Sequence, residues 1–151
     1  MIKITHKNRI GYEIRTLDNL LMRRMVADSA KYGIDEATIL HGWIIGYLYD
    51  NQDREIFQKD VETEFSLARS SVTCIVKLME KKGYITRESV PYDARLKKLC
   101  LTQKGEEINQ RTRCNIDKLE NELCDRLTQE ELQQFLTISR KLKSSLTEEF
   151  A

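Results

Sequence analysis

The segment from Arg69 to Lys82 constrains the fold of this chain more than any other part of it. Four apolar residues recur at spacings i, i+3, i+4 and i+7, so they share one buried side of a helix: Val72, Ile75, Val76 and Met79. The opposite side carries short polar and basic side chains: Ser70, Thr73, Cys74, Lys77 and Lys81. Gly83 follows as a helix stop. The pattern therefore predicts an amphipathic helix with one packed face and one exposed polar, basic face.

A shorter helical segment precedes this helix, and a β-hairpin follows it. Residues 58–65 place Val61 and Phe65 four positions apart, and the three residues 66–68 then form a turn. Residues 84–90 are rich in β-branched and aromatic side chains, the only proline lies in the turn at 91–94, and apolar and polar residues alternate from Lys97 to Leu101. Two helices joined by a three-residue turn and followed by a hairpin are predicted.

The remaining segments are helical and amphipathic. Apolar positions from Ile10 to Met25 predict a long first helix that stops near Gly33, and Asp35 is expected to cap a second helix that continues to about residue 50. A long helix is predicted over residues 102–126, and the capping box at 128–131 opens the last helix. The predicted fold is mainly α, with about six helices, a hairpin wing and long terminal helices whose apolar stripes suit dimerisation, although a monomer in which these stripes pack on each other would also bury them.

Charge is unevenly distributed along the chain. The whole sequence has 25 basic and 24 acidic residues, but residues 69–104 contain nine Lys or Arg against three Asp or Glu. Such a basic block indicates a polyanionic partner, although a solvated face balanced by folded neighbours would also explain it.

Other classes of protein fit the sequence poorly. No run of about 18 apolar residues occurs, and the first residues lack the apolar stretch of a secretory signal, so we expect a cytosolic protein. The four cysteines form no C-x-x-C pair, which predicts reduced thiols and no metal site: Cys74, Cys100, Cys114 and Cys124. Common hydrolase and nucleotide-binding motifs are absent, so we expect no enzyme and no cofactor.

The order of helix, turn, helix and basic hairpin is typical of a winged helix-turn-helix, whose second helix enters the DNA major groove while the hairpin contacts the flanking backbone or minor groove. Hydroxyl and basic side chains can approach base edges and phosphates there. The candidate DNA contacts on the second helix and the hairpin are Arg69, Ser70, Ser71, Thr73, Lys77, Lys81, Arg87, Arg95 and Lys97.

Residues 65–105 resemble the MarR family of bacterial transcriptional regulators. R-S-S-V-T at 69–73 and E-K-K-G at 80–83 match its recognition-helix pattern, and the wing pattern matches at Asp93, Arg95, Leu101, Thr102 and Gly105. The resemblance implies that Arg95 enters the minor groove and that Asp93 braces the wing turn. Ala68 departs from the pattern, because the family commonly has a hydroxyl residue there as the helix cap.

The same resemblance implies an organisation and a function. The whole chain, residues 1–151, would form one MarR-like unit, with a DNA-binding lobe at 34–102 and a helical dimerisation lobe at 1–33 and 103–151. The expected function is a homodimeric, sequence-specific repressor on a pseudo-palindromic operator in double-stranded DNA.

The resemblance further implies release from DNA by a small aromatic or anionic ligand. His41, Trp43 and Tyr47 are the candidate ligand contacts, although aromatic residues at such spacing are also ordinary core residues. Two other functions remain open: a winged-helix protein-interaction module, or a regulator of the same fold that senses oxidants through a thiol such as Cys74.

Overall fold

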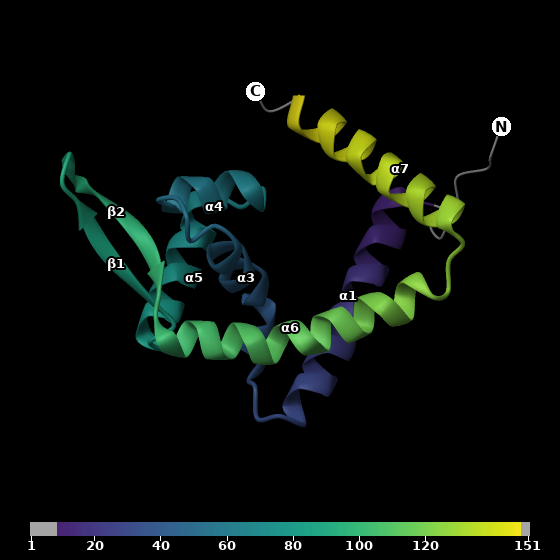
Figure 1. The fold of residues 1–151 in the computed structure, drawn as a ribbon. Helices are drawn as coiled ribbons and strands as arrows, with labels where there is room; N and C mark the ends of the chain where they lie inside the picture. The colour runs from purple at the N-terminus through teal and green to yellow at the C-terminus, as the bar shows by residue number, and fades with distance from the viewer. Residues whose placement is uncertain (1–8, 149–151) are drawn as a thin grey trace. The chain divides into compact units, whose positions relative to one another are not determined.

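The computed structural model describes residues 9–148 and has the predicted class of fold, with seven helices and a two-stranded antiparallel hairpin in this part of the chain (Figure 1). The elements in chain order are α1 (Ile10–Ala30), α2 (Glu36–Leu40), α3 (Gly42–Asp50), α4 (Gln58–Glu64), α5 (Arg69–Lys81), β1 (Ile85–Val90), β2 (Asp93–Leu101), α6 (Gln103–Cys124) and α7 (Gln129–Glu148). They divide into two compact units, residues 1–115 and 116–151, and α6 runs from the first into the second. None of the helices between residues 9 and 148 is both long and apolar enough to span a membrane.

The prediction of one helix over residues 35–50 is wrong, because the helix breaks at His41. Asp35 caps α2 as predicted, and its Oδ1 accepts a hydrogen bond of 3.0 Å from the Thr38 amide. His41 has φ −110° and ψ 4°, outside the helical range. In one unbroken helix, Ile39 and Ile44 would point about 140° apart. The break allows both to be buried, and Gly42 has little intrinsic preference for a helix.

The core of residues 1–115 forms around the apolar side of α5. Val72, Val76 and Met79 are buried as the spacing predicts, whereas Ile75 is half-buried. Helix α5 packs on α4 and on β1, and α3 packs on β2. Val61 of α4 is fully buried. The polar side of α5 therefore faces away from this core.

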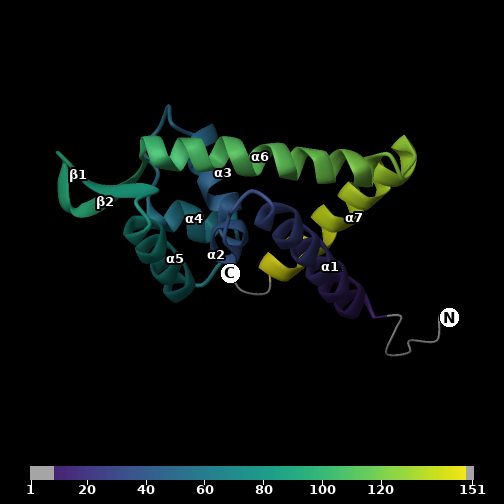
Figure 2. The same cartoon turned by 90° about the horizontal axis from the view of Figure 1, so that it is seen from below.

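The hairpin pairs Ile85 with Leu101 at its base and continues in antiparallel register to Ser89 and Lys97. A register shift follows before Val90, and β2 begins at Asp93, earlier than the alternation of residues predicted. The hairpin projects beyond α5 in both views (Figures 1 and 2). The backbone amide of Leu99 also donates a 2.7 Å hydrogen bond to the Ile56 carbonyl, so the segment before α4 lies against β2.

The junction between the hairpin and α6 is tightly packed. Thr102 Oγ1 donates to the Gly83 carbonyl at 2.6 Å and accepts from the Gly105 amide at 3.1 Å. A Cβ atom on Gly105 would lie 2.1 Å from the backbone oxygen of Tyr84. Because a backbone oxygen cannot rotate away as a flexible side chain can, only glycine fits here.

We therefore expect Gly105→Ala to lower the free energy of unfolding by about 1–3 kcal/mol, the usual cost of overpacking. Urea denaturation monitored by circular dichroism measures the change. Gly11→Ala is the matched control, because its Cβ would meet no atom within 4 Å in α1 and alanine favours the helix. Equal stability of the two variants would contradict the packing at Gly105.

An ion pair joins the start of α2 to the end of α5. Lys82 Nζ lies 2.7 Å from each carboxylate oxygen of Asp35 and 3.3 Å from Thr38 Oγ1. The hydrogen bond from Lys82 is the main reason that the pKa of Asp35 falls from 3.8 to about 2. Thr38 Oγ1 also lies 3.4 Å from the Tyr84 hydroxyl in the core.

The lowered pKa of Asp35 predicts a stability term that depends on pH. A carboxyl group with a depressed pKa in the folded state stabilises the fold above its unfolded pKa, and the stabilisation is lost as the pH falls from about 4 to about 2. Since the Asp35 side chain is 53% exposed, the contribution is at most about 1 kcal/mol. Urea midpoints across this pH range should fall less steeply for Asp35→Asn than for the unmodified protein, and Asp53→Asn should leave the slope unchanged.

Residues 116–151 form a unit with little core of its own. The predicted capping box is present, because Thr128 Oγ1 accepts from the Glu131 amide at 3.2 Å and the Thr128 amide donates to the Glu131 carboxylate at 2.8 Å. These bonds from Thr128 lower the pKa of Glu131. No side chain described between residues 116 and 147 is buried. The large apolar side chains that remain exposed are Leu123, Leu127, Phe135, Leu136, Ile138 and Leu146.

Candidate nucleic-acid interface

The exposed side of α5 carries most of the predicted DNA contacts. Its exposed residues include Arg69, Ser70, Ser71, Cys74, Lys77 and Lys81. Ala68 is the N-cap residue and makes no capping hydrogen bond through its side chain, in keeping with its departure from the family pattern. The helix therefore offers hydroxyl, thiol and cationic groups on one surface.

Thr73 is placed differently from its neighbours on α5. Its hydroxyl donates to the Arg69 carbonyl at 2.9 Å and accepts from Gln58 Nε2 at 3.2 Å. The side chain is half-buried between α4 and α5. Thr73 thus ties the two helices together, and its contact with DNA remains a prediction.

Acidic residues hold several cations of the hairpin. Arg87 of β1 donates through Nη2 and Nε to Glu80 of α5 at 2.8 and 3.1 Å. Lys98 lies 3.7 Å from Glu88, and Lys97 Nζ donates to the Ser89 hydroxyl. The Arg87–Glu80 pair links β1 to α5, whereas the contacts of Lys98 and Lys97 join the two strands of the hairpin.

The turn of the hairpin presents Arg95. The Asp93 carboxylate accepts a 2.9 Å hydrogen bond from the Arg95 amide and lies 3.8 Å from its Nε atom. The Arg95 side chain is nevertheless 95% exposed. Asp93 thus has the geometry of the turn brace that the family resemblance implies, and Arg95 projects into solvent.

A groove of about 660 Å³ lies between the first turn of α4, α5 and the hairpin. It is lined by Phe57, Gln58, Lys59, Glu62, Arg69, Thr73, Arg87, Arg95, Leu96 and Lys97. Five of these side chains are cationic and one is acidic. Gln58 and Lys59 were not among the predicted contacts, because Gln58 is uncharged and Lys59 lies outside the basic block at residues 69–104. Such a groove suits the phosphate backbone of a nucleic acid.

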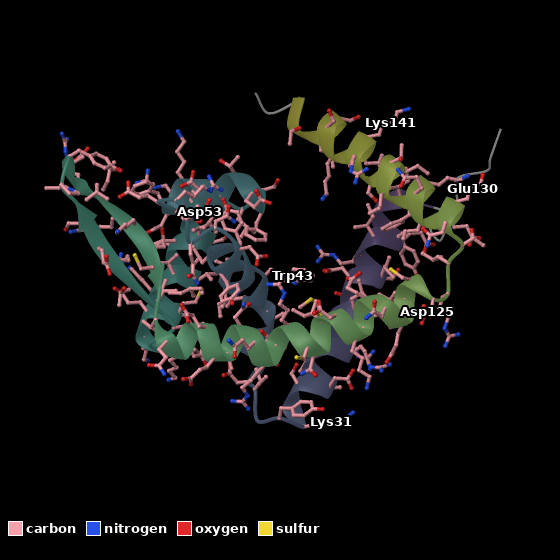
Figure 3. All side chains as sticks on the ribbon, in the orientation of Figure 1. Lys31, Trp43, Asp53, Asp125, Glu130 and Lys141 are labelled. Carbon is pink, nitrogen blue, oxygen red and sulfur yellow. The ribbon has the colours of Figure 1, made fainter. Side chains whose placement is uncertain are left out.

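The three candidate ligand contacts have different surroundings. Burial lowers the pKa of His41, which lies at the break between α2 and α3. Trp43 at the start of α3 is 46% exposed, so its alternative assignment to the core is wrong (Figure 3). Tyr47 packs edge-to-face on Phe65 at 5.7 Å and accepts a 2.8 Å hydrogen bond from Arg54. The structure therefore gives Tyr47 a packing role, and binding of a ligand by these residues remains a prediction.

The four cysteines are free thiols in the structure. Cys74 and Cys114 are exposed, whereas Cys100 and Cys124 are half-buried. Burial raises the pKa of Cys100. Within residues 9–148 no three His, Cys, Asp or Glu side chains are grouped so that they could hold a metal ion.

The helix-turn-helix and its basic hairpin define the class of this protein as winged helix. Residues 35–96 match the family model described as MarR family. The HTH-type transcriptional regulator PapX of Escherichia coli is 29% identical over 111 residues, which are 74% of this chain and 66% of PapX. About a third of PapX therefore lies outside the match.

Solved structures agree with this family. The transcription regulator MarR from Oenococcus oeni PSU-1 is 26% identical, with a TM-score of 0.74 over 90% of this chain and 99% of that one. A Staphylococcus aureus MepR–DNA complex superposes with a TM-score of 0.80 over 95% of this chain and 99% of MepR, and at 24% identity it supports the fold alone. Residues 35–96 thus match the MarR family, and the whole chain is similar in sequence and fold to transcriptional regulators of this kind.

Proposed function

We propose that this protein is a transcriptional repressor that binds a pseudo-palindromic operator in double-stranded DNA as a homodimer. The observation that carries the proposal is the cationic groove between α4, α5 and the hairpin, together with the exposed Arg95 beside it. PapX is named a transcriptional regulator, and MepR was solved with DNA, which supports the same role here. In this proposal, residues 34–102 bind DNA in the cytoplasm.

Each part of this surface has a physical role in the proposal. Helix α5 enters the major groove, where the short hydroxyls of Ser70 and Ser71 approach base edges and Lys77 reaches a phosphate. Arg69 and Lys59 contact the backbone from the groove. Arg95 enters the neighbouring minor groove, whose negative potential is strongest where it is narrow.

The dimer in this proposal is formed by residues 1–33 and 103–151. Helix α1 exposes a seam of apolar side chains, of which Ile14 is 56% exposed, and α7 exposes Phe135 at 53%. A monomer in water would leave both surfaces uncovered, whereas a second copy buries them. The symmetry of such a dimer presents one α5 to each half of the operator.

We also propose that a small aromatic or anionic ligand releases the protein from DNA. The exposed Trp43 and the half-buried His41 next to the break between α2 and α3 offer an aromatic surface and a polar nitrogen. Because α2 is bonded to the end of α5 through Asp35 and Lys82, a ligand at this break can bias the position of α5. No catalytic step is part of this function.

The first test compares Arg95→Ala with Lys77→Ala. Operator sequences are selected from a random duplex pool, and affinity is measured by fluorescence anisotropy over a range of salt concentrations. Arg95→Ala should cost about 1–3 kcal/mol of binding on selected operators, whereas Lys77→Ala should mainly reduce the salt slope by about one. Arg23→Ala on α1 removes the same charge as Arg95→Ala elsewhere and should change neither quantity. Unchanged affinity and slope in both test variants would contradict the proposed function.

The second test concerns the dimer. Light scattering should give a mass of about twice the 17.8 kDa of one chain. Leu146→Glu places a charge on an apolar side chain that is 62% exposed on α7, so it should shift the protein toward monomers by disrupting the proposed interface. Gln133→Glu adds the same charge at an exposed polar position of α7 and should leave the mass unchanged. A monomeric unmodified protein would contradict the homodimer.

A further inference from the structure

A hydrogen bond connects the turn of the hairpin to a segment far away in sequence. The hydroxyl of Tyr92, at the tip between β1 and β2, donates to Glu55 Oε2 at 2.5 Å. The two residues are 37 positions apart, and both are exposed. A bond from a phenol to a carboxylate is charge-assisted and stronger than a bond between neutral groups.

Glu55 is a fixed point for this bond, because both of its neighbours are held. Ile56 is buried, and its carbonyl accepts the Leu99 amide of β2 at 2.7 Å. Arg54 donates to the Tyr47 hydroxyl at 2.8 Å and to Asn51 Oδ1 at 3.0 Å. The Arg54 amide also donates to the Asn51 carbonyl at 3.3 Å, so the backbone on each side of Glu55 is bonded, to the hairpin through Ile56 and to the end of α3 through Arg54.

Tyr92 is connected in turn to Arg95 through two residues of the tip. Asp93 follows Tyr92 directly, and its carboxylate accepts the Arg95 amide. The tip itself is irregular, since the register shifts between Ser89 and Val90. The contacts of Tyr92 and Asp93 therefore restrain the short stretch of backbone from which the exposed Arg95 side chain extends.

We propose that Glu55 and Tyr92 form a latch that positions the wing tip so that Arg95 meets the minor groove, and that neither residue contacts DNA itself. The proposal rests on the DNA-binding function proposed above. The measured affinity for DNA is proportional to the fraction of molecules whose wing is in the binding position. Loss of one hydrogen bond of this kind should raise the ratio of displaced to latched wings by about three- to tenfold.

The variants Tyr92→Phe and Glu55→Gln test the latch, since each alters one partner of the bond and keeps nearly the same shape. Tyr32→Phe removes a hydroxyl from an exposed tyrosine between α1 and α2, and it serves as the control for Tyr92→Phe. Asp53→Asn removes a negative charge two residues before Glu55 on the same segment, and it controls for the charge (Figure 3).

The first measurement uses the free protein and needs no DNA. Trypsin cleaves after Arg95, and the cleavage rate reports how often the tip leaves its restrained conformation. Both latch variants should be cut several-fold faster than the unmodified protein, at unchanged thermal stability, whereas both controls should match it. Unchanged cleavage after Arg95 in both latch variants would overturn the latch.

The second measurement compares two duplexes of about three helical turns, one with a central A-tract and one rich in G·C. An A-tract narrows the minor groove and attracts an inserted arginine. The latch variants should lose most of the A-tract preference of the unmodified protein and keep its salt slope. The double variant should lose no more than Tyr92→Phe alone, because Tyr92→Phe removes the bond that Glu55→Gln weakens by removing its charge.

A direct contact of Tyr92 with DNA gives a different result. Glu55→Gln would then strengthen binding to both duplexes as much as Asp53→Asn should, because each substitution removes one negative charge. Its effect would also add to that of Tyr92→Phe. That outcome overturns the latch and leaves the proposed function intact. If the unmodified protein binds neither these duplexes nor any duplex selected from the random pool, the proposed function fails and the role of the latch in DNA binding fails with it, whatever the cleavage rates show.

Discussion

Burial of the apolar side of α5 is the interaction on which the rest of residues 1–115 depends. Val72 and Val76 are completely excluded from solvent between α4 and β1. Their burial fixes the rotation of α5 about its axis, so the exposed residues are those on the opposite side. A charge at either valine would leave an unpaired buried group and would remove the orientation of the candidate DNA-binding surface together with the stability.

The two units of the chain differ in how far they can fold without a partner. The first unit has a buried core that extends from α1 to α6, whereas no described side chain from 116 to 147 is buried. Burial of apolar area is the main stabilising term in folding, so α7 gains little from its own unit. For this reason, the proposed dimer would be both the functional assembly and a condition for the stability of the terminal helices.

Sequence reasoning succeeded where short-range patterns decide the structure. The face of α5, the Asp35 cap, the hairpin and the capping box at Thr128 and Glu131 all depend on residues a few positions apart. It failed at His41, because the break in the helix depends on burying Ile39 and Ile44 in the same core.

The contacts that position the site could not be predicted in the same way. The pairing of Leu99 with Ile56 and the bonds from Gln58 to Thr73 and from Tyr92 to Glu55 join distant positions, for which the intervening residues carry no pattern. The exposure of Trp43 could not be predicted either, because tryptophan side chains occur both in cores and at surfaces.

In the proposed complex, the acidic partners of the hairpin would let a nearly neutral protein bind DNA with geometric selectivity. Glu80 holds Arg87, and Glu88 holds Lys98, so these cations already have a carboxylate neighbour before any phosphate arrives. Exposed pairs of this kind contribute little to stability, and their main effect is to orient the strands. A DNA phosphate can pair with such a cation only by displacing the carboxylate that already neutralises it. The net attraction of these cations to any duplex is therefore reduced. Arg95 also has a carboxylate neighbour, Asp93 at 3.8 Å, but its side chain is 95% exposed and its backbone amide is held by the same carboxylate. Selectivity in the proposed complex therefore depends on where the wing places one arginine more than on the total positive charge.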